Sequence, residues 1–436
     1  MSKTTVYIEA RDCLPFENTP PQQVLNDFIT EHRDKVFWFS AQNKLTQDNH
    51  LAEYDYRRGC WCAGRFIGEA SLEDDHNRYQ ISIKPRFGNA VFFRMLEEIH
   101  NIKITKSLSA YQKSDNWGGL VKKIIAFIWL GKLAAANLHG LPKTQVKIKH
   151  VGHMIKGIIH VRQSIPKYYT NQQLVSYRRE KFIDDSIAQI IFQAYHILKD
   201  DLSALSGKMP DTAQDALDQV FSQINQRRFV SRREYQNIKY KDIYNSWRPL
   251  VEFSWDIIQK HHQKMESSAA RKGFGFFIDM AEIWEQYLRS LLKKNLAPMG
   301  WRLLDNQLRV YPGTFFSRLM IPDIIFEKEQ RLLLWDAKYK QMEGRFFDLD
   351  REDFFQIHTY IQYYAKGKVV LAGGLLYPLA KPLADAKSPY LLTPENIGTT
   401  FLIDGVELRD QADINEDQDI AQMEQAFLQR VNDLLE

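Results

Sequence analysis

Two apolar strands joined by a short polar turn, at residues 321–340, constrain this chain more than any other feature. The segment reads IPDIIFEKEQRLLLWDAKYK. The run Leu332–Trp335 is wholly apolar, which is typical of a central strand buried on both faces. Asp336 and Lys338 lie two residues apart, so their side chains point to the same side of the second strand. Hairpin pairing would bring Asp323, at the start of the first strand, alongside Asp336.

A carboxylate and a lysine at the end of a buried strand are costly unless they pair or bind a metal. Two carboxylates suit Mg²⁺, with Mn²⁺ as an alternative, and the cation would activate water for phosphodiester hydrolysis. Lys338 would orient or deprotonate that water and stabilise the charged transition state. The backbone carbonyl of Ala337 is a further candidate ligand. An edge hairpin with solvated charges would not explain the apolar run, so we predict catalytic roles for Asp323, Asp336 and Lys338.

A predicted helix at residues 277–296 precedes the strands and carries Glu282 and Glu285 on one face. Either carboxylate could join the metal site, and Glu285 is the preferred candidate. The alternative is a surface ion pair between Glu285 and Arg289, one turn further on.

A second predicted helix, at residues 351–364, follows the strands and carries Gln356 and Tyr360 one turn apart. Side chains of these types can hold a substrate phosphate or order the attacking water. Taken alone they indicate only ordinary polarity on a helix surface. Beside the hairpin, they become candidates for the catalytic site (Gln356) and for nucleic-acid contact (Tyr360).

The chain has 436 residues, which is too many for one typical core and suggests two or three domains. The pattern predicts an α+β multidomain protein with three regions. These are a β-rich mixed N-terminal domain at 1–165, a helical middle region at 166–270, and a C-terminal α/β core at 271–436. The expected strands are 36–40, 79–84, 146–161, 302–310, 321–326, 331–338 and 369–376, and the expected helices are 92–102, 120–133, 183–198, 213–224, 247–265, 277–296, 351–364 and 420–436.

The composition narrows the class of protein without naming it. A net charge of +4 permits contact with nucleic acid but does not argue for it. Three cysteines argue against a disulfide scaffold, and Cys60 and Cys62 are interpreted as strand residues rather than zinc ligands. His150, His153 and His160 lack a fourth ligand for zinc. With no apolar segment long enough for a signal peptide or a membrane span, we expect a cytoplasmic protein that does not bind a membrane.

The densest basic stretch is QRRFVSRREY, at residues 226–235, in which aromatic residues alternate with positive charges. This pattern suits a nucleic-acid backbone, so Arg227, Arg228, Arg232 and Arg233 are candidate DNA contacts. A solvated loop or a contact to an acidic partner explains the same stretch equally well.

Several segments together resemble the McrC family, the nuclease subunits of McrBC-type modification-dependent restriction systems. The most specific are PDIIFE and LLLWDAKYK, followed by the helix with Gln356 and Tyr360 and by VVLAGGLLYP. The segments MAEIWEQYL, GHMIKGIIHVRQSI, IDDSIAQIIFQAYHIL and ISIKPRFGN extend the resemblance over most of the chain.

The resemblance implies a PD-(D/E)xK nuclease core with Asp323, Asp336 and Lys338 in the family's catalytic positions. Glu285 and Gln356 match less specifically. It also implies an AAA+ NTPase partner of the McrB type that hydrolyses GTP and moves double-stranded DNA, with the N-terminal region docking on this motor. The sequence has no GxxxxGK[ST] nucleotide-binding loop of its own. Two alternatives stay open, namely a stand-alone repair nuclease and an adaptor that activates the motor without cutting DNA.

Overall fold

The computed structural model describes residues 4–17, 36–39, 50–56, 58–73, 76–102, 117–205, 209–224, 226–266, 274–304, 308–340, 342, 349–381, 383, 387–389, 398–408 and 416–435. The chain forms two compact units. The first unit contains Met1–Val121 and Ala270–Glu436, and the second contains Lys122–Ala269. The first unit is therefore discontinuous in sequence.

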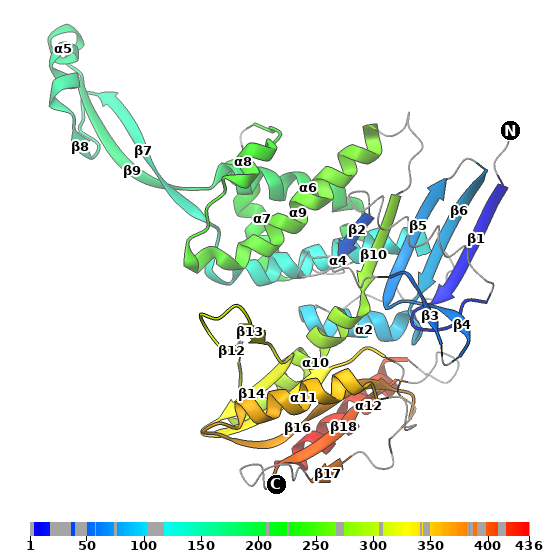
Figure 1. Ribbon diagram of the computed structural model, residues 1–436. Coiled ribbons are helices and arrows are strands. Elements are labelled where there is room, and N and C mark those ends of the chain that lie inside the picture. Colours follow the sequence, from blue (N-terminus) through cyan, green and yellow to red (C-terminus); the bar gives the residue numbers. More distant parts are fainter. Residues whose placement is uncertain are drawn as a thin grey trace. The chain divides into compact units, whose positions relative to one another are not determined.

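A five-stranded sheet in the first unit has the order β1-β6-β5-β10-β2 (Figure 1). Its strands are β1 (Thr4–Arg11), β2 (Val36–Phe39), β5 (Phe66–Glu73), β6 (Asn77–Lys84) and β10 (Phe274–Asp279). Tyr79, Ile81 and Ile83 are buried in alternation along β6, as the period-two pattern predicted. Gly68 allows β10 to approach β5, because a Cβ there would lie 1.9 Å from the Phe276 carbonyl oxygen. A small sheet pairs β3 (Ala52–Asp55) with β4 (Cys60–Ala63).

A six-stranded sheet in the same unit has the order β11-β14-β15-β16-β18-β17. Its strands are β11 (Arg302–Leu303), β14 (Ile324–Lys328), β15 (Arg331–Ala337), β16 (Val369–Leu379), β17 (Lys387–Pro389) and β18 (Thr400–Glu407). The central strands β15, β16 and β18 are parallel, and β14 pairs antiparallel with β15. Leu332 to Trp335 are all at most 1 % exposed, as expected for a strand covered on both faces.

Helices cover this second sheet. They are α10 (Met280–Leu296), with η4 (Ala297–Met299) after it, α11 (Arg351–Tyr364) and α12 (Glu416–Asn432). On α11, Ile357 and Ile361 pack in one cluster with Leu332 and Leu334 of β15. A separate two-stranded hairpin joins β12 (Leu308–Val310) to β13 (Arg318–Met320).

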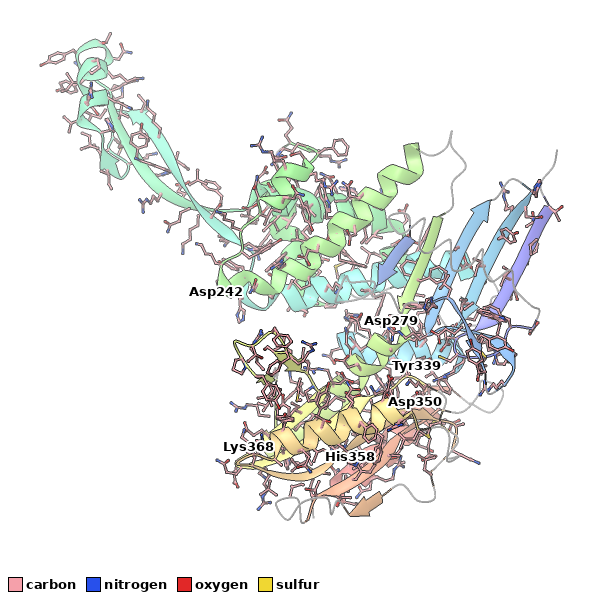
Figure 2. All side chains as sticks on the ribbon, viewed as in Figure 1. Asp242, Asp279, Tyr339, Asp350, His358 and Lys368 are labelled. Carbon is pink, nitrogen blue, oxygen red and sulfur yellow. The ribbon has the colours of Figure 1, made fainter. Side chains whose placement is uncertain are left out.

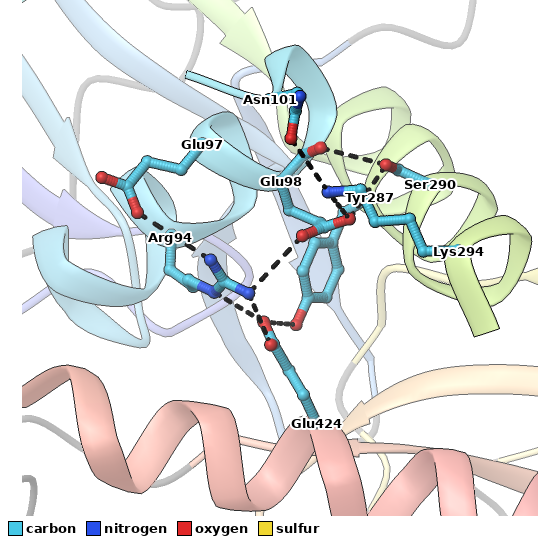
Figure 3. Close-up of polar contacts among 8 residues, drawn as sticks. All are labelled: Arg94, Glu97, Glu98, Asn101, Tyr287, Ser290, Lys294 and Glu424. Carbon is cyan, nitrogen blue, oxygen red and sulfur yellow. Dashed lines mark hydrogen bonds and ion pairs between the residues drawn. The ribbon is translucent and has the colours of Figure 1, made fainter. Parts of the chain in front are cut away.

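A buried polar network fixes α10 and α12 to α2 (Gly88–His100) (Figure 3). Arg94 of α2 donates to both carboxylate oxygens of Glu424 on α12, at 2.9 and 2.7 Å. The Tyr287 hydroxyl of α10 also donates to Glu424, at 2.8 Å. Ser290 and Lys294 of α10 contact Glu98 of α2. These contacts tie the helix that carries Glu285 to the N-terminal part of the chain.

The second unit contains a helical body, with most of α4 (Trp117–Ala136), η1 (Asn137–His139), α6 (Asp185–Leu205), α7 (Asp211–Gln223), α8 (Arg232–Gln236), η2 (Asp242–Trp247) and α9 (Arg248–Glu266). In its core the Trp129 indole donates to the Ser254 hydroxyl at 2.8 Å. A long arm projects from this body, formed by β7 (Lys143–Gly152), β8 (Ile158–Ile159) and β9 (Leu174–Ile183), with α5 (Val161–Asn171) at its tip (Figure 1). Within the described residues, no helix is long and apolar enough to span a membrane.

The structure corrects several predicted elements. The helix expected at 277–296 begins at Met280, because Phe277 belongs to β10 and the Asp279 side chain caps the helix by accepting from Ala281 N–H. The middle region is not helical throughout, since β9 lies within it. The strand expected at 302–310 contains two short strands, β11 and β12, with 305–307 outside the described residues. Asp323 precedes β14 rather than opening it, and Val161 begins α5 rather than ending a strand.

Other predictions are confirmed. The helix at 351–364 has the expected bounds, and Cys60 and Cys62 lie on β4 with their sulfur atoms 4.0 Å apart. The mixed α+β class is correct. The two compact units do not follow the boundaries of the three predicted regions, and that functional division stays a prediction.

Candidate active site

The β14–β15 hairpin brings Asp323 to Asp336. Ile324 pairs with Trp335, so continuing the register sets Asp323 opposite Asp336. Asp323 Oδ2 accepts the backbone N–H of Ala337 at 2.7 Å, which fixes this carboxylate at the end of β15. The pairing predicted from the period of the two strands is therefore present.

Lys338 is held by polar groups from both neighbouring segments. Its Nζ lies 2.6 Å from Asp336 Oδ2 and 3.2 Å from Asp353 Oδ1, and it donates to Gln356 Oε1 at 3.0 Å. Gln356 in turn donates from Nε2 to the Tyr360 hydroxyl at 2.9 Å. The two predicted residues of α11 are thus brought into the group around Lys338.

Glu285 approaches the same carboxylates from α10. It is one of the charges that raise the pKa of Asp323, and Asp336 raises the pKa of Glu285 in return. Glu282, by contrast, accepts from Gln286 at 2.8 Å along its own helix. Arg289 donates to the backbone carbonyl of Asp323. Glu285 therefore interacts electrostatically with Asp323 and Asp336, and Glu282 also raises the pKa of Glu285.

Burial and mutual repulsion favour the neutral forms of these acids. Burial, followed by the charges of Asp336 and Glu285, raises the pKa of Asp323 to about 8. Burial raises the pKa of Glu285 to about 7, although Arg289 opposes the shift. Burial also raises the pKa of Asp336, against the effect of Lys338. A divalent cation would relieve this repulsion, so the chemistry of the donors fits a hard metal ion.

The pKa of Lys338 is raised, because Asp336 and Asp353 outweigh the effect of burial. The lysine therefore stays protonated, which favours an orienting and charge-stabilising role over proton abstraction.

The described residues contain no group of three or more His, Cys, Asp or Glu side chains that could hold a metal ion as they stand. The contacts above give a reason, since one oxygen of Asp323 binds Ala337 N–H and one oxygen of Asp336 binds Lys338. Metal binding by Asp323, Asp336 and Glu285 would require these side chains to rearrange. The predicted metal ligands, including the Ala337 carbonyl, remain predictions.

A second lysine extends the polar group along the chain. Lys340 Nζ lies 2.7 Å from Asp353 Oδ2, so Asp353 bridges Lys338 and Lys340. Asp353 is only 7 % exposed and belongs to the first turn of α11, which begins after Asp350 (Figure 2). Sequence reasoning missed both residues. The signal for Lys340 was present, because Asp336, Lys338 and Lys340 follow the period of two.

The residue between the two lysines faces a different environment. Tyr339 is 5 % exposed, and the Arg86 guanidinium lies 4.5 Å from the centroid of its ring. Arg86 N–H donates to Asp12 Oδ1 at 2.6 Å, and Arg86 Nη2 donates to the Lys340 carbonyl at 3.3 Å. Asp12 and Arg86 follow β1 and β6 and form a buried ion pair, with Arg86 Nε 3.9 Å from Asp12 Oδ2. Through Arg86, this pair links the five-stranded sheet to the segment that follows β15.

The predicted DNA-binding arginines lie in the second unit. Arg228 is paired with Asp185 at 2.6 Å and with Glu234 at 2.8 Å, which leaves it poorly suited to phosphate. Arg227 lies 5.0 Å from the centroid of the Phe192 ring, and Arg232 and Arg233 are exposed on α8. Contact with DNA by this stretch stays a prediction.

Residues 63–378 match the model of a family described as McrBC, the McrBC 5-methylcytosine restriction system component. This match covers more than half of the chain. The chain belongs to this family. The resemblance seen in the sequence motifs is thereby confirmed. No curated protein matches the chain.

Two solved structures from Thermococcus gammatolerans are similar to the McrBC-family chain. The first is a half-complex from the tetradecameric assembly of McrB AAA+ hexamers with bound McrC, with 15% identity and a TM-score of 0.47. That alignment covers 98% of this chain and 100% of the other. The second is the McrBC complex, with 14% identity and a TM-score of 0.33, covering 67% of this chain and 88% of the other.

Proposed function

We propose that this McrBC-family chain is the DNA-cleaving subunit of a restriction complex, with a PD-(D/E)xK nuclease core in the first unit. The observation that carries the proposal is the convergence of Asp323, Asp336 and Glu285 beside Lys338 at the end of a buried parallel strand. Such carboxylates, buried and shifted towards neutrality, are unusual outside functional sites. Family membership and the motif around Asp323 agree with this proposal.

The residues have distinct proposed roles. Asp323, Asp336 and Glu285, with the Ala337 carbonyl, would hold Mg²⁺ or Mn²⁺. When bound, the cation would activate water and offset charge on the phosphate. Lys338, kept protonated by its two aspartates, would orient the attacking water and stabilise the negative charge that develops on the phosphate. Gln356 holds the lysine in place, and Tyr360 holds Gln356.

The proposed partner is an AAA+ NTPase of the McrB type that uses GTP. The arm of the second unit offers a surface for such a partner, because large apolar side chains are exposed around its tip. Ile158 is 80% exposed and Tyr169 is 86% exposed. Soluble proteins rarely leave such side chains gathered without a partner. The arm begins within the region predicted to dock on the motor, since β7 starts at Lys143.

The test is DNA cleavage with Mg²⁺ and GTP, by the chain alone and together with its AAA+ partner. The substrates are duplexes with and without 5-methylcytosine, and the control is Asp336→Ala. We expect cleavage only with the partner, and its complete loss in the variant. Cleavage by the isolated chain would favour a stand-alone repair nuclease. Stimulated nucleotide hydrolysis without any cleavage would favour the adaptor, and the nuclease proposal would then be wrong.

A further inference from the structure

The β12–β13 hairpin is a second feature that leads directly into the candidate active site. Its strands pair Leu308 with Met320 and Val310 with Arg318, and Asp323 follows three residues after Met320. Three residues of extended chain span at most about 11 Å. The base of the hairpin therefore lies within about 11 Å of Asp323, measured along the chain.

The tip of this hairpin exposes aromatic rings. Phe315 is 96% exposed, Phe316 45% and Tyr311 53%. Phe316 contacts both other rings edge-on, with centroids 5.0 Å from Phe315 and 5.3 Å from Tyr311. A ring as exposed as Phe315 contributes nothing to the core, so the fold does not explain it.

The tip is nevertheless held in one conformation. The backbone and hydroxyl of Thr314 both donate to the Tyr311 carbonyl, at 3.3 and 2.9 Å, and the Ser317 hydroxyl donates to Val310 at 3.2 Å. Tyr311 adopts a left-handed φ of 52°, which bends the chain at the start of the loop. Because these bonds order the loop, the rings are presented at low entropic cost to a binding partner.

The hairpin is also anchored to the helix that serves the active site. The hydroxyl groups of Tyr311 and Tyr363 lie 3.2 Å apart, and Tyr363 belongs to α11. The same helix carries Gln356, which contacts Lys338. A ligand bound across the hairpin would therefore be positioned by the same helix that positions the lysine.

The charge around the rings indicates the chemistry of that ligand. From Leu308 to Pro322 the sequence contains Arg309 and Arg318 and no acidic residue, and both arginines are exposed. Lys366 adds a third cation, with its Nζ 4.6 Å from the centroid of the Tyr363 ring. Exposed rings between cations suit a polyanion with stacked bases, whereas a purely apolar protein partner would not require the charges.

We propose that the β12–β13 hairpin binds the DNA duplex beside the cleavage site and inserts Phe315, supported by Phe316, between neighbouring bases. Apolar side chains that enter a duplex unstack one base step and bend the DNA. Here such insertion would fix the position of the scissile phosphate relative to Asp323. The inference rests on the proposed nuclease function for its substrate, but it concerns binding and not the hydrolytic step.

The test measures DNA binding without cleavage. The full chain, alone and with its AAA+ partner, is titrated in Ca²⁺ with a short duplex carrying 2-aminopurine, a base whose fluorescence rises when it is unstacked. We expect a rise with the wild-type chain. Phe315→Ala should abolish the rise and weaken the Kd for DNA roughly tenfold, in line with loss of one stacking contact. Phe315→Trp should retain both.

Tyr7→Ala is the matched control, because Tyr7 is 68% exposed on β1 of the same unit and should affect neither signal. Unchanged fluorescence and Kd in Phe315→Ala would overturn the inference, as would an absence of DNA binding both with and without the partner. Loss of partner association at unchanged DNA affinity would show that the hairpin binds protein instead. A Phe315-dependent signal without cleavage in Mg²⁺ would overturn only the nuclease proposal, whereas cleavage with no dependence on Phe315 would overturn only this inference.

Discussion

The end of β15 in the first unit and the arm in the second unit depart from the usual distribution of side chains in opposite directions. Around β15, carboxylates are buried or half-buried beside the half-buried Lys338, with Asp336 only 2% exposed. On the arm, apolar residues face solvent, with Ile158 80% exposed. Buried charge costs stability and is retained where chemistry needs it, while exposed apolar surface is retained where a partner covers it. The contrast separates the proposed reaction site from the proposed assembly surface.

The largest effect should follow removal of a carboxylate at β15. Asp336→Ala removes one predicted metal ligand and one of the partners of Lys338, so the rate of partner-dependent DNA cleavage should fall by roughly a thousandfold or more. Association with the AAA+ partner, measured by size-exclusion chromatography, should be unchanged. If the variant still cleaves at near the wild-type rate, the end of β15 is not the reaction site, and its contrast with the arm has no functional meaning.

The next effect concerns stability and compares a buried with an exposed ion pair. Asp12→Ala leaves the Arg86 side chain, only 4% exposed, without its carboxylate, which should lower the free energy of unfolding by about 3–5 kcal/mol. Asp185→Ala removes an acid 63% exposed from Arg228 and should cost less than about 1 kcal/mol. Urea denaturation measures both values. Equal decreases in the free energy of unfolding would show that burial does not increase the contribution of the Asp12–Arg86 pair to stability.

Variants at the arm should affect assembly alone. Ile158→Ser and Tyr169→Ser replace exposed side chains, so the melting temperature of the isolated chain should stay the same. The Kd for the AAA+ partner should rise roughly tenfold, as for the loss of one important interface residue. Calorimetric titration measures it, with Tyr56→Ser as control because Tyr56 is 89% exposed on the other unit. An unchanged Kd would show that the arm is not the docking surface.

The last comparison concerns the pH dependence of stability without metal. Asp323 and Glu285 have pKa values of about 8 and 7 in the folded protein, above their ordinary values of 3.8 and 4.5. The folded state therefore binds more protons, and its stability falls as pH rises from about 4 to about 8 and then levels off. Mg²⁺ should raise the melting temperature by a few degrees more at pH 8 than at pH 6, because it binds the ionised acids.

Asp323→Asn is the control for this measurement and should reduce both the pH dependence and the response to Mg²⁺. Thermal melts in EDTA and in Mg²⁺ provide the comparison. A melting temperature that rises between pH 6 and pH 8 in EDTA would contradict the shifted carboxylates.

The sequence predicted the centre of the site because strand periodicity is a local property. Asp336 and Lys338 share a face at a spacing of two, and the turn between the strands sets Asp323 opposite Asp336. Asp353 was missed because an acid in the first turn of a helix has an ordinary explanation in the helix dipole. Its contact with Lys338 and Lys340 depends on how α11 packs against the sheet, and local sequence patterns do not predict that packing.

The arm shows a different limit of the sequence. β9 lies in the middle region that was predicted to be helical, and its residues LVSYRREKFI lack a regular apolar alternation. In the three-stranded arm, most residues of β9 are exposed or half-buried, so a regular alternation of apolar and polar residues is not required. The pairing of β10 with β5 could not be predicted from local sequence patterns either, since the whole of the second unit separates the two strands.

That separation has a consequence for synthesis. When β1, β5 and β6 have left the ribosome, the strand that pairs with the other edge of β5 does not yet exist, because β10 begins at Phe274. At typical translation rates the intervening unit takes on the order of ten seconds to make. During that time β5 exposes an unpaired edge, the kind of surface that recruits foreign strands. A nascent chain stalled in the second unit should therefore depend on chaperones, and a fragment that ends before Phe274 would leave the first sheet permanently without β10.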